Sequence, residues 1–339
     1  MFEKNKTYLI TGAAGFIGYF LAWRLLEQGC RVIGLDNLND YYDVNLKKAR
    51  LEKLRNYEQF IFMKGDISDK EAVFGAFETH EPHIVVNLAA QAGVRYSIEN
   101  PDVYIQSNLI GFYNILEACR HHPVDHLVYA SSSSVYGANE KVPFTEMDFV
   151  DHPVSLYAAT KKSNELMAYT YSHLYKIPST GLRFFTVYGP MGRPDMAYFG
   201  FTQKYFAGEP IRIFNNGNME NDLYRDFTYI DDIVEGLVRL LEVPPILDGG
   251  VPHTVFNIGN HRPEKLMDFI ETLERALSRS LGREVLFKKI FEPIKPGDVP
   301  ATFASIDRLE KAVGFKPQTS IEAGLQKFTD WYCEYYQVK

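Results

Sequence analysis

Short apolar runs rich in β-branched residues alternate with amphipathic stretches through the first half of the chain. The apolar runs predict strands at 7–11, 31–36, 60–64, 84–88, 126–131 and 179–185. The stretches between them predict helices at 17–28, 45–55, 70–80, 108–120 and 155–175. Such alternation is typical of an α/β fold, here a doubly wound parallel sheet with helices on both faces.

The second half is less regular and richer in Gly, Pro and Asn. A helix at 231–241 and a strand at 255–258 are expected to rejoin the sheet. We therefore predict two domains: an α/β domain of residues 1–185 plus about 229–260, and a smaller C-terminal lobe of about 186–228 plus 261–339. The lobe is expected to lie over the carboxyl ends of the strands, where open α/β sheets bind ligands.

Three glycines follow the first predicted strand at intervals of three residues: Gly12, Gly15 and Gly18. Such glycines permit a tight turn, close approach of the backbone to a pyrophosphate, and close packing of helix on strand. The helix beyond them, near Phe16 and Ile17, offers N-terminal N–H groups and a positive dipole end to phosphates. Because a strand precedes the turn and a helix follows it, the motif indicates a Rossmann-type dinucleotide site rather than an ordinary turn.

Asp36 stands 18 residues after Gly18, at the end of the second predicted strand. A carboxylate there accepts hydrogen bonds from ribose hydroxyls and repels a 2′-phosphate. The next residues, Asn37 and Leu38, supply no arginine for such a phosphate. The sequence therefore predicts NAD in preference to NADP.

Two further strand ends fit the same cofactor site, although neither is specific alone. Asp66 and Ile67 follow the third predicted strand and are candidates to clamp the adenine. Leu88, Ala89 and Ala90 follow the fourth and are small enough to let a cofactor lie against them.

Tyr157 and Lys161 lie at positions i and i+4 of a predicted helix and so share one face. A tyrosine has a pKa of about 10, and a nearby lysine cation would favour its phenolate and make it a usable base. This spacing is weak evidence in a chain with 22 tyrosines. A serine run at 131–134, at the end of a strand 25 residues upstream, strengthens it, because serine hydroxyls there could bridge the substrate oxygen and the tyrosine.

Composition excludes several other classes of function. The net charge of −7 disfavours a nucleic-acid partner. We see no targeting segment and no apolar run long enough to cross a membrane. Three widely spaced cysteines predict a reducing, cytoplasmic location, and nine histidines without ligand spacing predict no metal site.

Together these motifs resemble the extended short-chain dehydrogenase/reductase superfamily across essentially the whole chain. Within it the chain is most similar to UDP-glucuronate 4-epimerases, NAD-dependent isomerases. Long motifs carry this resemblance: 36–42, 89–97, 188–197, 225–229 and 296–301.

The resemblance implies roles residue by residue. Tyr157 would be the acid/base, with Lys161 tuning it and holding the nicotinamide ribose, and Ser132 as its hydroxyl partner. The remaining implied contacts are Gln91 and Asn108 with the cofactor, Ser134 and Thr186 near the sugar carboxylate, Arg95, Arg193 and Arg225 with the uronate and diphosphate charges, and Asn215 and Asp298 around the uridine. Lys295 departs from the arginine of related hexose epimerases and offers no bidentate fork.

The implied reaction is C4 epimerisation of UDP-glucuronate to UDP-galacturonate through a 4-keto intermediate. Alternatives are a UDP-glucose or UDP-N-acetylglucosamine 4-epimerase, a UDP-glucuronate decarboxylase, and a non-catalytic NAD-binding sensor. Decarboxylation is helped by a carboxyl group where this chain has Ser133 and Ser134, and a sensor would not need both Tyr157 and Lys161.

The resemblance also implies a homodimer formed through the helices at 108–120 and 155–175. Their apolar stripes exceed what one sheet face needs. The stripes are Leu109, Phe112 and Leu116 on the first helix, and Leu166, Tyr169 and Tyr171 on the second.

Overall fold

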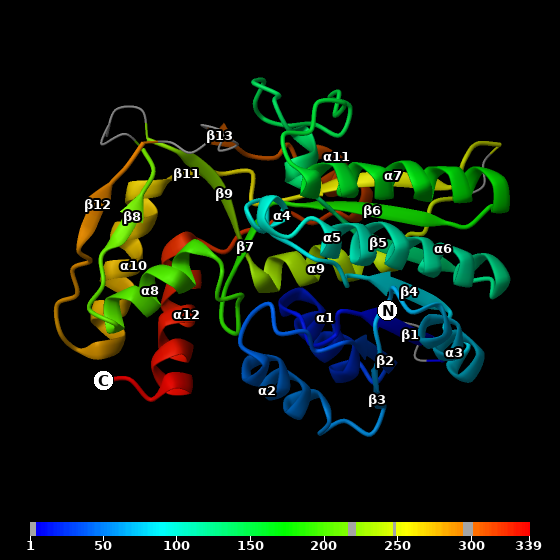
Figure 1. Cartoon of the computed structure of the whole chain (residues 1–339), viewed down its shortest axis with the longest axis horizontal. Coiled ribbons are helices and arrows are strands. Elements are labelled where there is room, and N and C mark those ends of the chain that lie inside the picture. Colours follow the sequence, from blue (N-terminus) through cyan, green and yellow to red (C-terminus); the bar gives the residue numbers. More distant parts are fainter. Residues whose placement is uncertain (1–4, 216–221, 247–248, 294–300) are drawn as a thin grey trace.

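A computed structural model describes residues 5–215, 222–246, 249–293 and 301–339 of the chain. Its centre is a seven-stranded sheet in the order β10-β6-β5-β4-β1-β2-β3, with every neighbouring pair parallel (Figure 1). The strands are β1 (Thr7–Thr11), β2 (Arg31–Asp36), β3 (Phe60–Lys64), β4 (Ile84–Asn87), β5 (His126–Ser132), β6 (Ser179–Phe184) and β10 (His253–Ile258). The predicted doubly wound parallel sheet is confirmed, and the strand predicted at 255–258 does rejoin it, beside β6.

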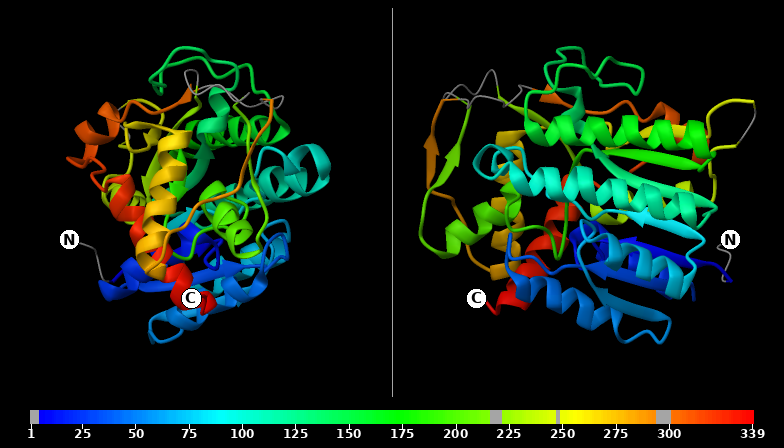
Figure 2. Two further views of the ribbon diagram at one scale, coloured as in Figure 1. Left: turned by 90° about the vertical axis from the view of Figure 1, so that its left-hand side faces the viewer. Right: turned by 45° about the vertical axis from the view of Figure 1, so that its right-hand side comes forward.

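Helices cover both faces of this sheet (Figure 2). One face packs against α1 (Phe16–Glu27) and α9 (Ile230–Leu241), with α2 (Val44–Leu54) beside α1. The other packs against α3 (Lys70–His80), α6 (Phe112–His121) and α7 (Leu156–Tyr175). Since both faces are covered, β1, β4 and β6 are buried throughout, which explains the apolar runs Tyr8–Ile10 of β1 and Ile84–Val86 of β4.

The helix predicted at 108–120 is longer and less regular than expected. Its chain path starts at α4 (Tyr96–Glu99) and α5 (Asp102–Tyr104), passes through a π-helical segment, η1 (Ile105–Gly111), and continues as α6. Two tight contacts hold η1. The Asn108 amide bonds the backbone of Gln91, and a Cβ on Gly111 would lie 2.6 Å from the Ile67 side chain.

A smaller group of elements lies beside the carboxyl ends of the sheet, at the left of Figure 1. Its strands are β7 (Thr186–Tyr188), β9 (Tyr224–Tyr229), β11 (Pro263–Lys265) and β13 (Ala301–Thr302), with β8 (Ile211–Ile213) paired to β12 (Lys289–Phe291). Its helices are α8 (Ala197–Phe206), α10 (Leu266–Leu281) and α12 (Ile321–Tyr336). By contrast, α11 (Asp307–Val313), which sequence assigned to the smaller lobe, packs on α9 and β10 of the larger domain.

The apolar stripes expected at a subunit interface are partly used inside the chain. Phe112 and Leu116 are buried between α6 and the sheet, whereas Leu166 and Tyr169 are exposed on α7. Among the described helices, none is long and apolar enough to cross a membrane.

Candidate active site

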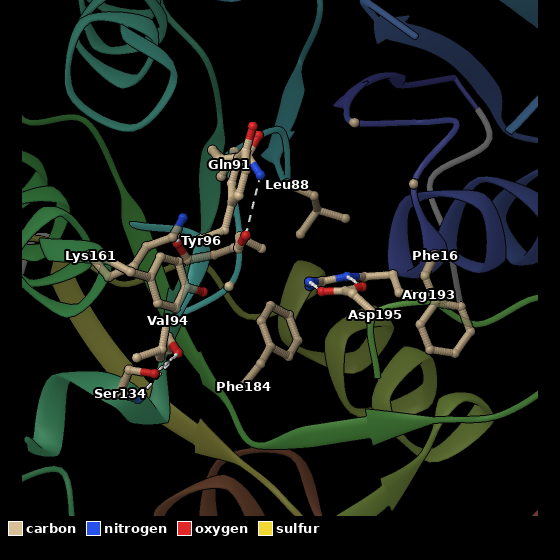
Figure 3. A pocket seen from close by; sticks show the side chains of 18 of the residues that line it. Phe16, Leu88, Gln91, Val94, Tyr96, Ser134, Lys161, Phe184, Arg193 and Asp195 are labelled. Atoms are coloured by element: carbon tan, nitrogen blue, oxygen red, sulfur yellow. Dashed lines mark hydrogen bonds and ion pairs between the residues drawn. The ribbon is translucent and has the colours of Figure 1, made fainter. Parts of the chain in front are cut away.

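A cavity of about 1030 Å³ runs along the carboxyl ends of the parallel strands and under the smaller lobe. The turns after β1, β2, β4 and β5 line one part of it, and β7, the 193–197 segment and β9 line another. In the view of Figure 3, Lys161 and Ser134 lie on one side, Arg193 and Asp195 lie on the other, and Phe184 lies between them.

The glycine turn forms a close-fitting cradle at this cavity. Gly12 has φ +71°, a left-handed conformation that favours glycine, and a Cβ on Gly18 would lie 2.1 Å from the Gly12 carbonyl oxygen. Helix α1 begins after Gly15 without a side-chain cap. Its first residues, including Phe16 and Ile17, line the cavity, and the N–H groups of a first helical turn have no partner within the helix. The cradle therefore fits a pyrophosphate.

Asp36 is held in place by backbone donors. Its Oδ2 atom accepts from the Ala14 N–H at 3.0 Å, and its Oδ1 atom accepts from the Leu38 N–H at 2.8 Å. The carboxylate lines the cavity, and each oxygen keeps a further lone pair for a ribose hydroxyl. This geometry fits the role that the sequence predicted for Asp36.

The adjacent strand ends are also ordered at the cavity. Asn37 donates to Asp66 at 2.7 Å, and Ser68 donates to the other Asp66 oxygen. Burial favours the neutral acid, but these hydrogen bonds hold the pKa of Asp66 below its ordinary value. Four more predicted positions also line the cavity near them: Ile67, Leu88, Ala89 and Ala90.

Asn108 lies behind the cavity wall and is not among its lining residues. It is 1% exposed, and its side chain bonds both backbone groups of Gln91 and the Thr160 hydroxyl. The Asn108 amide therefore joins the Gln91 loop to α7. Gln91 itself lines the cavity, and Asn108 holds its backbone in place from behind.

Tyr157, Lys161 and Ser132 line the cavity together. Burial raises the pKa of Tyr157, and its hydrogen bond with Ser132 and the charge of Arg193 oppose that rise. Burial lowers the pKa of Lys161 to about 8, and its Nζ donates to the Ala130 carbonyl at 3.1 Å. Ser132 and Arg193 therefore favour the phenolate here, and the tuning of Tyr157 by Lys161 stays a prediction.

A buried ion pair joins β6 to α7, and a hydrogen bond from β5 reaches the same carboxylate. Ser131, next to Ser132, donates to Glu165 Oε1 at 2.7 Å, and Arg183 donates to both Glu165 oxygens at 2.8 Å. Glu165 lies one turn beyond Lys161 on the helix face that also carries Tyr157. These hydrogen bonds hold the end of β5, which carries the serines, at a fixed distance from α7, which carries Tyr157. Ser134 is held in turn by Ser132, whose hydroxyl lies 3.2 Å from both its N and Oγ atoms.

Arg193 reaches the cavity as one member of a polar group. Its guanidinium makes two hydrogen bonds to Asp195, and the Tyr41 hydroxyl donates to the same carboxylate at 3.2 Å. Burial favours the neutral form, but Asp195 raises the pKa of Arg193, which keeps it charged. The side chain is 25% exposed, so a simple surface position does not describe it. Sequence reasoning missed Asp195 and Tyr41 as site residues, although both fall within the long motifs.

The other predicted substrate contacts divide into two groups. Arg95, Thr186 and Arg225 line the cavity, with Arg95 over the Phe214 ring at 5.1 Å. Asn215 does not line it; it is 1% exposed and donates to Asp222. Asp298 and Lys295 lie outside the described residues.

Within the described residues, no group of three or more His, Cys, Asp or Glu side chains could hold a metal ion.

Comparison with known proteins adds three findings. The model of the GDP-mannose 4,6 dehydratase family matches residues 9–328. Protein CapI of Staphylococcus aureus is 53% identical over 97% of this chain and 99% of its own length, and a probable UDP-glucuronate 4-epimerase of Rhizobium meliloti (strain 1021) is 48% identical over 97% and 98%. The crystal structure of UDP-glucuronic acid 4-epimerase from Bacillus cereus, in complex with UDP-glucuronic acid and NAD, superposes with a TM-score of 0.85 at 32% identity, covering 97% of this chain and 100% of that one.

Proposed function

Because this chain belongs to the GDP-mannose 4,6-dehydratase family, within the extended short-chain dehydrogenase/reductase superfamily, we propose that it is an NAD-dependent UDP-glucuronate 4-epimerase. It would interconvert UDP-glucuronate and UDP-galacturonate. The observation that carries the proposal is one cavity in which the Tyr157–Ser132 pair and the charged Arg193 lie beyond a dinucleotide cradle. This arrangement provides a proton acceptor and an anion partner for one sugar.

The cofactor assignment rests on the fit of the chain to NAD. The glycine turn and the uncapped start of α1 fit a pyrophosphate. Asp36, held at the cavity by backbone donors, would accept from ribose hydroxyls and repel a 2′-phosphate. NAD, when bound, supplies the acceptor and donor of the hydride at C4 of the sugar. We assign the nicotinamide ribose to Tyr157 and Lys161, and the rest of NAD to the glycine turn, Asp36 and its neighbours.

The residues of this chain would move the proton. The Tyr157 phenolate accepts the proton of the sugar 4-hydroxyl and later returns it to the same oxygen, once hydride has been delivered to the opposite face of C4 of the 4-keto sugar. Ser132, already bonded to Tyr157, shares that proton and favours the phenolate. Lys161 adds positive charge on the same helix face, which further favours the ionised tyrosine.

The uronate carboxylate imposes a second requirement on the site. The 4-keto intermediate from glucuronate is a β-keto acid, which loses carbon dioxide when its carboxylate stands perpendicular to the ketone plane. An epimerase must therefore hold that carboxylate in another orientation. We assign this task to Ser134 and Thr186, and the charges of uronate and diphosphate to Arg95, Arg193 and Arg225.

Two related reactions are less well supported by the residues present. Dehydration and decarboxylation are helped by a carboxyl group beside the tyrosine-paired hydroxyl, and here Ser133 and Ser134 occupy those positions. A neutral hexose would leave Arg193 without a carboxylate to bind, although it could still bind the diphosphate.

The test of this function is incubation of the purified protein with several nucleotide sugars and no added reductant, followed by chromatography. We expect UDP-glucuronate to give UDP-galacturonate, with UDP-glucose and UDP-N-acetylglucosamine turned over far more slowly. A pentose nucleotide as the main product, or turnover of a hexose alone, would contradict the assignment.

We also propose a homodimer formed through the outer faces of η1, α6 and α7. The exposed large apolar side chains there support it: Ile105, Ile110, Tyr113, Leu166 and Tyr169. Leu166→Arg should shift the sedimentation coefficient to that of a monomer, whereas Ile246→Arg, at an exposed apolar position elsewhere, should not. An unchanged coefficient for Leu166→Arg would place the interface elsewhere.

We further propose a cytoplasmic location for the protein and a division of binding roles between its two domains. Cys30, Cys119 and Cys333 are free thiols, which supports a cytoplasmic location. We assign NAD binding to residues 1–185 with about 229–260, and nucleotide-sugar binding to about 186–228 with 261–339, with α11 packed on the cofactor domain.

A further inference from the structure

Arg50 is a buried arginine that does not line the cavity yet joins its two halves. It lies on α2 and is 0% exposed. Its guanidinium donates to four oxygens from three separate segments. Among the ion pairs of the described residues, none includes Arg50, so its partners there are neutral oxygens. Burying a cation without an anionic partner costs free energy. The four hydrogen bonds of Arg50 offset part of that cost, which points to a role in the fold or at the site.

One end of the guanidinium holds the cofactor turn. Nη1 donates to the Ala14 carbonyl at 2.7 Å and to the Tyr42 hydroxyl at 2.8 Å. The N–H of the same Ala14 donates to Asp36. The turn is therefore fixed on one side by the candidate ribose carboxylate and on the other by Arg50.

The other end holds the loop that carries Arg193. Nη2 donates to the carbonyl oxygens of Met191 at 2.6 Å and Gly192 at 3.2 Å. Met191 has φ +54°, a left-handed conformation that is unfavourable for a side chain of this size. A Cβ on Gly192 would lie 1.7 Å from the Tyr198 hydroxyl. The loop is thus tightly constrained immediately before Arg193.

We infer that Arg50 is a positioning residue that couples the cofactor half of the cavity to its sugar half. The inference rests on the proposed function, because it takes Arg193 to bind the nucleotide sugar. The planar fork of an arginine reaches acceptors on two sides at fixed angles, which a lysine ammonium cannot do. Loss of the guanidinium would free both the Ala14 turn and the carbonyl groups of residues 191–192. Even a small displacement of a binding group lowers turnover strongly.

The test uses the full-length protein with Arg50→Met, which removes the fork, and Arg50→Lys, which keeps the charge. Leu51→Ala is the matched control, since Leu51 is a buried neighbour on α2 that does not line the cavity. Melting temperature, the Kd of NAD by calorimetry, and KM and kcat for UDP-glucuronate are measured for each. We expect Arg50→Met to raise the NAD Kd and the KM each about tenfold, Arg50→Lys to fall between it and wild type, and Leu51→Ala to lower only the melting temperature.

A double-mutant cycle with Arg193→Ala separates positioning from a general structural role. If Arg50 acts by placing Arg193, Arg50→Met should raise KM less than about threefold once Arg193 is gone. An undiminished KM effect in that background, or an Arg50→Met variant that matches Leu51→Ala, would overturn the inference. If wild-type protein does not turn over UDP-glucuronate, the proposed function fails by itself. The Kd of NAD then tests the inference on Arg50 without turnover, and an unchanged Kd in both Arg50→Lys and Arg50→Met rejects the coupling.

Discussion

The cofactor half and the sugar half of the cavity are built in different ways. The cofactor half uses backbone groups and short side chains at successive strand ends, such as the glycine turn and Asp36. The sugar half uses long side chains from distant segments, such as Arg95, Arg193 and Arg225, brought together by the smaller lobe. The first half is therefore fixed by the sheet, whereas the second depends on packing between segments that are distant in the sequence.

The largest expected effect falls where the halves meet. Tyr157→Phe removes the base and should lower kcat by about 10²–10⁴-fold, while the Kd of NAD changes little because the cradle is untouched. Tyr169→Phe, an exposed tyrosine on the same helix, serves as the control in the same assays. Near wild-type turnover in Tyr157→Phe would remove the tyrosine from the mechanism.

Arg193→Ala tests the sugar half alone. A charge-assisted hydrogen bond contributes about 1.5–3 kcal/mol, so kcat/KM for UDP-glucuronate should fall roughly ten- to more than hundredfold. The Kd of NAD should change far less. Arg212→Ala, an arginine paired with Glu292 outside the cavity, should leave both values unchanged.

UDP-glucose then identifies the partner of Arg193. A smaller loss of kcat/KM with UDP-glucose than with UDP-glucuronate indicates the sugar carboxylate, and an equal loss indicates the diphosphate. Wild-type kinetics with both substrates would return Arg193 to a structural pairing with Asp195.

Asp36→Ala tests the cofactor half alone. It removes ribose acceptors and the repulsion of a 2′-phosphate, so the Kd of NAD should rise about tenfold while that of NADP rises less. Asp69→Ala removes the cap of α3 outside the cavity and should leave the ratio of the two Kd values unchanged. Equal weakening of NAD and NADP by Asp36→Ala would contradict the ribose assignment.

For Lys161 we expect an effect on stability rather than on activity. Burial lowers its pKa from 10.5 to about 8, so between these values the unfolded chain binds more protons than the folded one. Stability from this group therefore rises with pH across that window, by up to about 3 kcal/mol. Urea unfolding of NAD-free protein at pH 7.5 and pH 10 should show a larger increase in the free energy of unfolding for wild type than for Lys161→Met. Lys48→Met, at an exposed position, keeps Lys161 and should gain stability in parallel with wild type. Parallel behaviour of wild type and Lys161→Met would show that Lys161 is not effectively buried.

The same contrast explains which features could be predicted from sequence. The glycine turn, Asp36 and the Tyr157–Lys161 pair are local patterns on regular elements, and their positions in the structure agree with their predicted surroundings. The commitment of Asn108 to Gln91 and Thr160 could not be foreseen, because it depends on the irregular η1 segment.

Long-range contacts were the other limit. The hydrogen bond from Tyr41 to Asp195, the partner of Arg193, joins residues 154 positions apart. The hydrogen bonds from Arg50 to Met191 and Gly192 span 141 and 142 positions and reach a loop with left-handed backbone. Periodicity and spacing carry no signal for such contacts. The burial of Phe112 and Leu116 was likewise missed, because apolar residues at helical spacing do not reveal which face meets the sheet.

The most direct test of the account follows one hydrogen atom. Wild-type protein is incubated with UDP-glucuronate carrying deuterium at C4, with catalytic NAD and no reductant, and the products are analysed by mass spectrometry and NMR. The account predicts UDP-galacturonate that retains the deuterium at C4, with no net formation of NADH. Both results are expected because the same bound cofactor takes the hydride and returns it to the same sugar. UDP-galacturonate that has lost the deuterium, a decarboxylated nucleotide sugar, or stoichiometric NADH would contradict it.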